Sequence, residues 1–196
     1  MKSRVISGIL VIAFLGVSNI SFAQEEPTNE PAAPAYSYGI TLSPIHLAIP
    51  MVEVTVEYGL EEKMSIAAIG GLGKIATETT TLSGTTKDSF TAIEVGAQFR
   101  YYVLGNLTHG MQVGAEALYL HLDRDETDSV SGTGEGLAVG PFVGYKIATE
   151  SGFTFDTQLG FQYVTAKAEV SAGNVSASTD DSDFIPLLNL NLGWSF

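Results

Sequence analysis

Apolar residues alternate with small or polar ones along the last nine positions of this chain, residues 188–196. The apolar positions are Leu188, Leu190, Leu192, Trp194 and Phe196, and the residues between them are small or polar. Successive side chains of a β-strand point to opposite faces, so the segment predicts a strand with one apolar face and one polar face. A chain built from such segments has to fold as a sheet that separates an apolar environment from a polar one.

Seven earlier segments show the same two-residue period, at residues 36–43, 51–58, 64–73, 89–104, 111–122, 137–147 and 153–164. Short connections alternate with longer ones, at residues 74–88, 123–135 and 167–182, which are rich in Thr, Ser, Gly and Asp and are expected to be loops. The first connection, residues 44–50, is short and apolar. The pattern predicts an all-β chain that forms an eight-stranded antiparallel up-and-down β-barrel.

The beginning of the chain predicts export. Lys2 and Arg4 precede an apolar run, and Ser21 and Ala23 are the small residues that a signal peptidase requires, so residues 1–23 are interpreted as a cleaved signal peptide. The apolar run is shorter than the roughly 20 residues that a membrane-spanning helix needs. Residues 24–35 are acidic and rich in Pro and predict a flexible leader, and residues 36–196 predict one barrel domain.

The composition limits the classes of partner. The chain has 9 basic and 22 acidic residues, and its formal net charge of −13 argues against binding to nucleic acid. With 45% hydrophobic residues it is too apolar to be disordered. It has no cysteine, which excludes disulfides and a lipoprotein anchor. No apolar run beyond residue 23 is long enough for a transmembrane helix, so a mature chain embedded in a membrane would have to be a closed barrel.

Charged residues gather on the polar faces of the expected strands. In a membrane barrel the apolar faces contact lipid, and these polar faces fill the narrow lumen. One interpretation is an ion pore or a proton path, and the other is a plug of paired charges that stiffens the barrel. We favour the plug, with each cation meeting two carboxylates, because buried charges are tolerated only when they are paired. The predicted lumen residues are Glu53, Glu57, Glu94, Arg100, Glu116, Lys146 and Asp156.

The sequence predicts no catalytic, cofactor-binding or metal site. His46, His109 and His121 fall in three separate parts of the expected barrel, so they predict neither a catalytic triad nor a zinc site. Residues 123–128 have acidic spacing, but they lack the glycine and the closing glutamate of an EF-hand loop. A weak divalent-cation site in that segment stays open as an alternative to a solvated loop.

The predicted signal peptide, the eight alternating segments and the last strand ending in Phe196 together resemble the small OmpA/OmpX-like outer-membrane β-barrel proteins of Gram-negative bacteria. The resemblance covers residues 36–196 and is strongest to small members whose function is uncharacterised. It implies a monomeric transmembrane barrel in the outer membrane, in contact with outer-membrane lipid and lipopolysaccharide. It also implies that the barrel-assembly machinery reads the last strand through Leu188, Leu190, Leu192, Trp194 and Phe196.

Three functions are compatible with these predictions. The first is a structural or surface-interaction barrel whose external loops meet an unidentified surface ligand. The second is a narrow, porin-like channel, and the third is a lipid A-modifying outer-membrane enzyme. The sequence favours the first and predicts that the chain is not an enzyme, because no catalytic motif is present.

Overall fold

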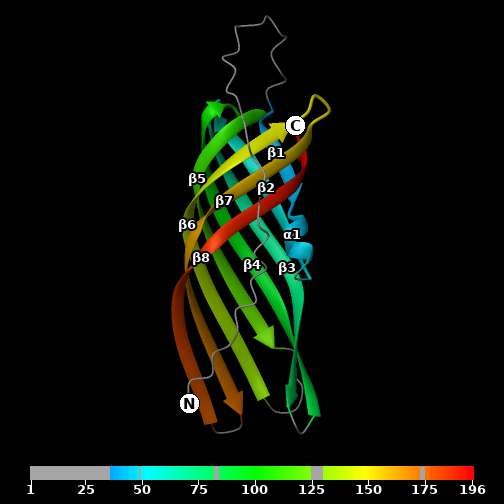
Figure 1. The fold of residues 1–196 in the computed structure, drawn as a ribbon, viewed down its shortest axis with the longest axis vertical. Coiled ribbons are helices and arrows are strands. Elements are labelled where there is room, and N and C mark those ends of the chain that lie inside the picture. The colour runs from blue at the N-terminus through cyan, green and yellow to red at the C-terminus, as the bar shows by residue number, and fades with distance from the viewer. Residues whose placement is uncertain (1–35, 49, 82–83, 125–129, 173–174) are drawn as a thin grey trace, which may run out of the picture. The chain divides into compact units, whose positions relative to one another are not determined.

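The computed structural model describes residues 36–48, 50–81, 84–124, 130–172 and 175–196 (Figure 1). The predicted signal peptide and leader lie outside these described residues. Within them the chain is all-β apart from one short helix. The elements are β1 (Tyr38–Leu42), α1 (Pro44–Leu47), β2 (Met51–Glu61), β3 (Met64–Thr81), β4 (Gly84–Gly105), β5 (His109–Arg124), β6 (Val130–Ala148), β7 (Phe153–Ala172) and β8 (Val175–Ser195).

Eight antiparallel strands follow one another in sequence order and close into a barrel. Each strand pairs with its neighbours in the sequence, and β1 pairs with β8 to complete the ring, with Ile40 opposite Trp194. Short turns join β2 to β3, β4 to β5 and β6 to β7, and we call the end of the barrel that carries them the turn end. The opposite end is the hairpin end. This topology confirms the predicted all-β, up-and-down arrangement.

Several strands are longer than the sequence predicted. The ladder between β3 and β4 runs without a break from Met64 opposite Tyr101 to Thr81 opposite Gly84, and that between β7 and β8 reaches Ala172 opposite Val175. The prediction of long loops at residues 74–88 and 167–182 is therefore wrong over most of their length. The loop predicted at residues 123–135 is wrong at residues 123–124 and 130–135, which are strand, while residues 125–129 lie outside the described residues. Residues 166–169 and 178–183 are exposed, so neither face needs apolar side chains and the two-residue period disappears although the strands continue.

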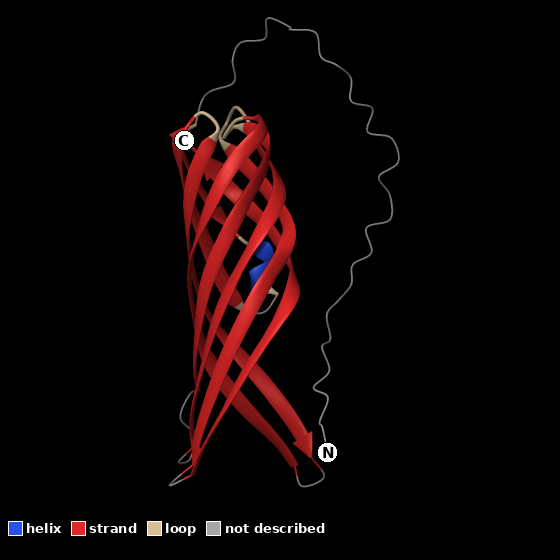
Figure 2. Ribbon diagram, turned by 90° about the vertical axis from the view of Figure 1, so that its left-hand side faces the viewer, coloured by secondary structure: helices blue, strands red, loops and turns tan. Residues whose placement is uncertain are grey.

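The first connection folds as the helix α1. The β1–β8 ladder ends at Leu42 opposite Leu192, after which Ser43 and Pro44 begin the helix. Proline suits this first helical position, because its φ angle is already helical and no intrahelical N–H is required there. Figure 2 shows α1, in blue, set among the strands about midway along the barrel. His46 of this helix faces a cavity that Glu94 of β4 also lines.

The barrel is polar inside and apolar outside. The largest fully buried side chains include Arg100, Lys146 and Gln158, whereas Leu159 is 58% exposed and Trp194 is 52% exposed. Soluble proteins show the opposite distribution, with Lys and Arg almost never fully buried unless paired. Among the described residues no helix has both the length and the apolar character needed to cross a membrane.

Candidate functional site

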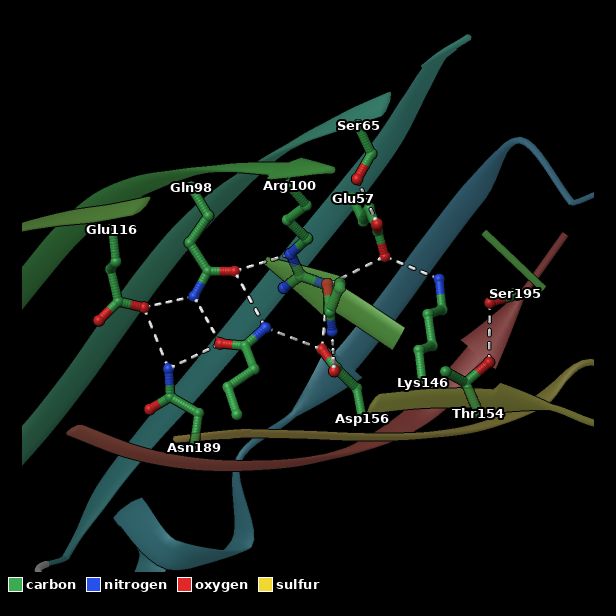
Figure 3. Close-up of polar contacts among 12 residues, drawn as sticks. Glu57, Ser65, Gln98, Arg100, Glu116, Lys146, Thr154, Asp156, Asn189 and Ser195 are labelled. Carbon is green, nitrogen blue, oxygen red and sulfur yellow. Dashed lines mark hydrogen bonds and ion pairs between the residues drawn. The ribbon is translucent and has the colours of Figure 1, made fainter. Parts of the chain in front are cut away.

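Four charged residues from four strands meet inside the barrel (Figure 3). Glu57 of β2, Arg100 of β4, Lys146 of β6 and Asp156 of β7 all point inward, and each is at most 4% exposed. Arg100 Nη1 lies 2.9 Å from Asp156 Oδ2 and 3.2 Å from Glu57 Oε2, and Lys146 Nζ donates to Glu57 Oε2 at 2.7 Å. Two cations and two carboxylates therefore compensate one another in the interior.

Neutral side chains donate further hydrogen bonds to these two carboxylates, Glu57 and Asp156. Glu57 Oε1 accepts hydrogen bonds from Ser65 Oγ at 2.5 Å and from Tyr102 OH at 2.8 Å. Asp156 accepts from Gln112 Nε2 at 2.5 Å and from Gln158 Nε2 at 3.1 Å. Buried ion pairs are tolerable only when further hydrogen bonds satisfy the remaining lone pairs, and both carboxylates meet that condition.

A layer of amides extends the network to Glu116 of β5. Gln98 Oε1 accepts from Arg100 Nε at 2.8 Å, while its Nε2 donates to Glu116 and, at 3.0 Å, to Gln158. Glu116 also accepts from Asn189 Nδ2 at 3.0 Å. Figure 3 shows the resulting continuous path of contacts from Lys146 to Glu116. We call the residues joined by these contacts the lumen network. They are Glu57, Ser65, Gln98, Arg100, Tyr102, Gln112, Glu116, Lys146, Asp156, Gln158, Gln162 and Asn189.

The structure separates the seven predicted lumen charges into two groups. All seven are buried, but Glu53 and Glu94 lie outside the lumen network, beside His46. Arg100 contacts two carboxylates as predicted. Lys146 differs from the prediction, because among the described residues it forms an ion pair with Glu57 alone. The strand register places Asp156 directly opposite Lys146, yet the lysine side chain reaches across to β2.

The three histidines have different surroundings. His109 Nε2 lies 2.5 Å from Tyr145 OH at the turn end, and His121 lies 3.2 Å from Asp123 in β5. His46 Nδ1 lies 2.8 Å from Ser43 Oγ, and its Nε2 is 3.2 Å from Glu53. Burial lowers the pKa of His46, and the carboxylate of Glu94 opposes this effect. Sequence reasoning missed this group, because it compared the histidines only with one another.

The last strand carries its predicted signal residues on the outer face and closes the ring. Leu188, Leu192, Trp194 and Phe196 are exposed, and Leu190 is half-buried. Phe196 O accepts backbone hydrogen bonds from Ser37 N at 2.8 Å and Tyr38 N at 3.1 Å, and Phe196 N donates to Tyr38 O at 2.8 Å.

Two aromatic pairs join β7 and β8 on this outer face. The rings of Phe153 and Trp194 are 5.5 Å apart at the turn end. Those of Tyr163 and Phe184, ten residues further along both strands, are 5.1 Å apart. The outward positions between the pairs hold no charged residue. They are Phe155, Thr157, Leu159 and Phe161 on β7, and Leu192, Leu190, Leu188 and Pro186 on β8.

Comparison of the chain with models of known protein families gives no match, and comparison with curated proteins gives none either. The resemblance to the OmpA/OmpX-like proteins therefore stays a prediction.

Proposed function

We propose that this chain is an outer-membrane β-barrel protein of a Gram-negative bacterium, with a closed lumen and with projecting hairpins that contact other surfaces. The proposal rests on the distribution of side chains, which is the reverse of that in a soluble protein, with polar residues inside and apolar residues outside. A buried network of charges lies inside a wall whose exposed side chains are large and apolar. In water such a wall would lose the free energy that burial of apolar side chains provides, about 25 cal/mol per Å², whereas in lipid it is the favoured surface.

The spacing of the aromatic pairs matches the thickness of a membrane. Ten residues separate Phe153 from Tyr163 on β7, and ten separate Trp194 from Phe184 on β8. At a rise of about 3.3 Å per residue and a strand tilt of about 40°, ten residues cover about 25 Å along the membrane normal. Outer-membrane barrels have an apolar band of about this height between two aromatic girdles. The two pairs therefore support the placement of the barrel in a bilayer.

Arginine substitutions at two positions on the same face of β7 test this placement. Leu159→Arg, midway between the aromatic pairs, should lower the free energy of unfolding in lipid vesicles by about 2–4 kcal/mol. Thr165→Arg, on the same face but beyond Tyr163, should lower it by about 0–1 kcal/mol. Urea titrations followed by the fluorescence of Trp194, the only tryptophan, measure both values. Equal losses at the two positions would contradict a membrane boundary near Tyr163.

The lumen network supports a closed barrel over a narrow, porin-like channel. Its contacts link side chains of β2, β4, β5, β6, β7 and β8, and Arg100 and Gln158 within it are fully buried. An eight-stranded barrel has an interior just wide enough for side chains to fill. We expect no steady openings in planar-bilayer recordings of the purified protein. Stable conductance on the nanosiemens scale would instead support the channel.

The hairpin end supplies the surface proposed for contact with other molecules. The β7–β8 hairpin continues about nine residues beyond Tyr163 and Phe184, with exposed Asp180, Asp181 and Lys167 on the projecting part. In the proposed orientation it extends past lipid into the lipopolysaccharide layer and toward the cell exterior. Antiparallel pairing makes it stiffer than a loop, so it presents fixed side chains to an unidentified surface ligand.

Single cysteines test which end of the barrel faces outward. The chain has no cysteine, so each introduced thiol is unique. Asp180→Cys, on the projecting hairpin, should react with a membrane-impermeant maleimide on intact cells. Glu62→Cys, an exposed position in a short turn, should react only after the outer membrane is permeabilised. If only Glu62→Cys is labelled on intact cells, the barrel has the opposite orientation. If neither variant is labelled, the proposed contact with external surfaces is wrong.

A further inference from the structure

Two buried carboxylates face each other beside His46, outside the lumen network. Glu53 comes from β2, Glu94 from β4 and His46 from α1, and one potential ligand atom from each lies within 4.8 Å of the others. His46 Nε2 is 3.2 Å from Glu53 Oε2. Glu53 is 4% exposed and Glu94 is 8% exposed. Three different elements therefore direct one nitrogen and two carboxylates toward one another.

This pair is less well compensated than the other buried carboxylates, because Glu53 lies 3.2 Å from an imidazole that carries a charge only when it is protonated. Glu57 and Asp156 each pair with a cation, and Glu116 accepts from three amides. Within the described residues, Glu94 Oε1 is buried with no hydrogen-bond partner. Two adjacent carboxylates beside a neutral imidazole are costly in a buried site, since leaving buried charge unpaired is strongly destabilising. A bound dication would neutralise both.

We propose that His46, Glu53 and Glu94 bind a divalent transition-metal ion, with Zn²⁺ as the best-fitting case. Imidazole nitrogen and carboxylate oxygen are ligands that zinc prefers, at bond lengths of about 2.0–2.2 Å. Tetrahedral geometry at these lengths places ligand atoms about 3.4 Å apart. The observed 3.2 Å between His46 and Glu53 is close to that value. The metal would tie α1 to the wall at β2 and β4.

Ser43 holds the imidazole of His46 through the ring nitrogen that faces away from the two carboxylates. Its Oγ lies 2.8 Å from His46 Nδ1, so it fixes the ring while Nε2 faces the carboxylates. Metal-binding histidines usually have such a partner on the second nitrogen. Ser43, His46 and Glu53 also have the composition of a hydrolytic triad. Ser43 is only 2% exposed, which leaves its hydroxyl no access to a substrate, and the geometry therefore favours the metal.

A cavity beside His46 and Glu94 would give a fourth ligand of the metal room. A space of about 390 Å³ is lined by His46 and Glu94, and by apolar side chains that include Leu118, Leu120 and Leu122 of β5. Three protein ligands leave one position of a tetrahedral ion for water or for a polar group of a small ligand. Structural zinc sites are closed by four protein ligands, so this site is of the open type.

Zinc binding to the purified, folded full-length barrel tests the proposal. Competition with a chromogenic chelator should give one Zn²⁺ per chain. Glu94→Gln, Glu53→Gln and His46→Ala should each weaken binding by more than about 100-fold, and Ser43→Ala by about 10- to 100-fold. The matched control is His121→Ala, because His121 also has two nearby carboxylates, Asp123 at 3.2 Å and Glu135 at 3.9 Å. This variant should keep the stoichiometry and affinity of the unmodified protein.

Thermal unfolding separates loss of the site from loss of the fold. Zn²⁺ should raise the unfolding temperature of the unmodified protein and of His121→Ala, but not that of Glu94→Gln. Without metal, Glu94→Gln should be at least as stable as the unmodified protein, because the amide has no charge to bury beside Glu53. Absence of stoichiometric binding, or undiminished binding in the glutamine variants, would overturn the proposal. So would ester hydrolysis that Ser43→Ala abolishes and a chelator leaves unchanged.

Discussion

Replacement of Arg100 by Met is expected to lower the free energy of unfolding of the barrel by about 3–5 kcal/mol, the cost of removing one partner from a buried ion pair. Arg100 is 1% exposed and contacts both Glu57 and Asp156. Methionine fills a similar volume but removes the one cation that forms an ion pair with Asp156 among the described residues. Urea titration in lipid vesicles, followed by Trp194 fluorescence, measures the loss.

Two further variants show whether the loss comes from the unpaired carboxylate. Asp156→Asn in the Arg100→Met background should restore part of the stability, because Glu57 keeps its ion pair with Lys146 at 2.7 Å. Lys167→Met removes an exposed cation from the projecting hairpin and should cost no more than about 1 kcal/mol. A small effect of Arg100→Met would show that the lumen network does not stabilise the barrel.

Deletion of Phe196 is expected to remove most of the folded protein from the outer membrane. The deletion eliminates three backbone hydrogen bonds to Ser37 and Tyr38 at the seam between β1 and β8. At about 1 kcal/mol each, these bonds stabilise ring closure by about 3 kcal/mol. It also removes the aromatic side chain of Phe196, which belongs to the assembly signal that the resemblance to OmpA/OmpX-like proteins predicts. The fraction of folded protein is measured from its heat-modifiable mobility on gels.

Phe196→Ala distinguishes the two effects of that deletion. This variant keeps the backbone bonds of the seam and loses only the exposed ring. It should refold normally from urea into lipid vesicles and yet assemble poorly in cells, whereas the deletion should fail in both. Normal amounts of folded deletion protein in the outer membrane would contradict both the seam argument and the assembly signal.

The strands and their two faces could be predicted from the sequence. The alternation in segments such as residues 153–164 and 188–196 follows directly from strand geometry, because each residue turns the side chain to the other face. The same local rule predicted which charges point inward, and Arg100, Lys146 and Asp156 are buried inside the barrel. The rule failed at the hairpin end, where Lys167 and Asp180 lie opposite each other in strands that were expected to be a loop.

Which inward side chains meet was decided only by the tertiary structure. Lys146 lies opposite Asp156 in the ladder but bonds to Glu57, 89 positions away in the chain. His46 joins Glu53 and Glu94 because β1 is short and α1 brings the first connection against the wall. The alternation of residues predicts whether a side chain points inward or outward. It does not predict the position of that side chain along the barrel axis or its neighbours across the lumen. Those depend on strand tilt, register and closure of the ring, which arise from all eight strands together.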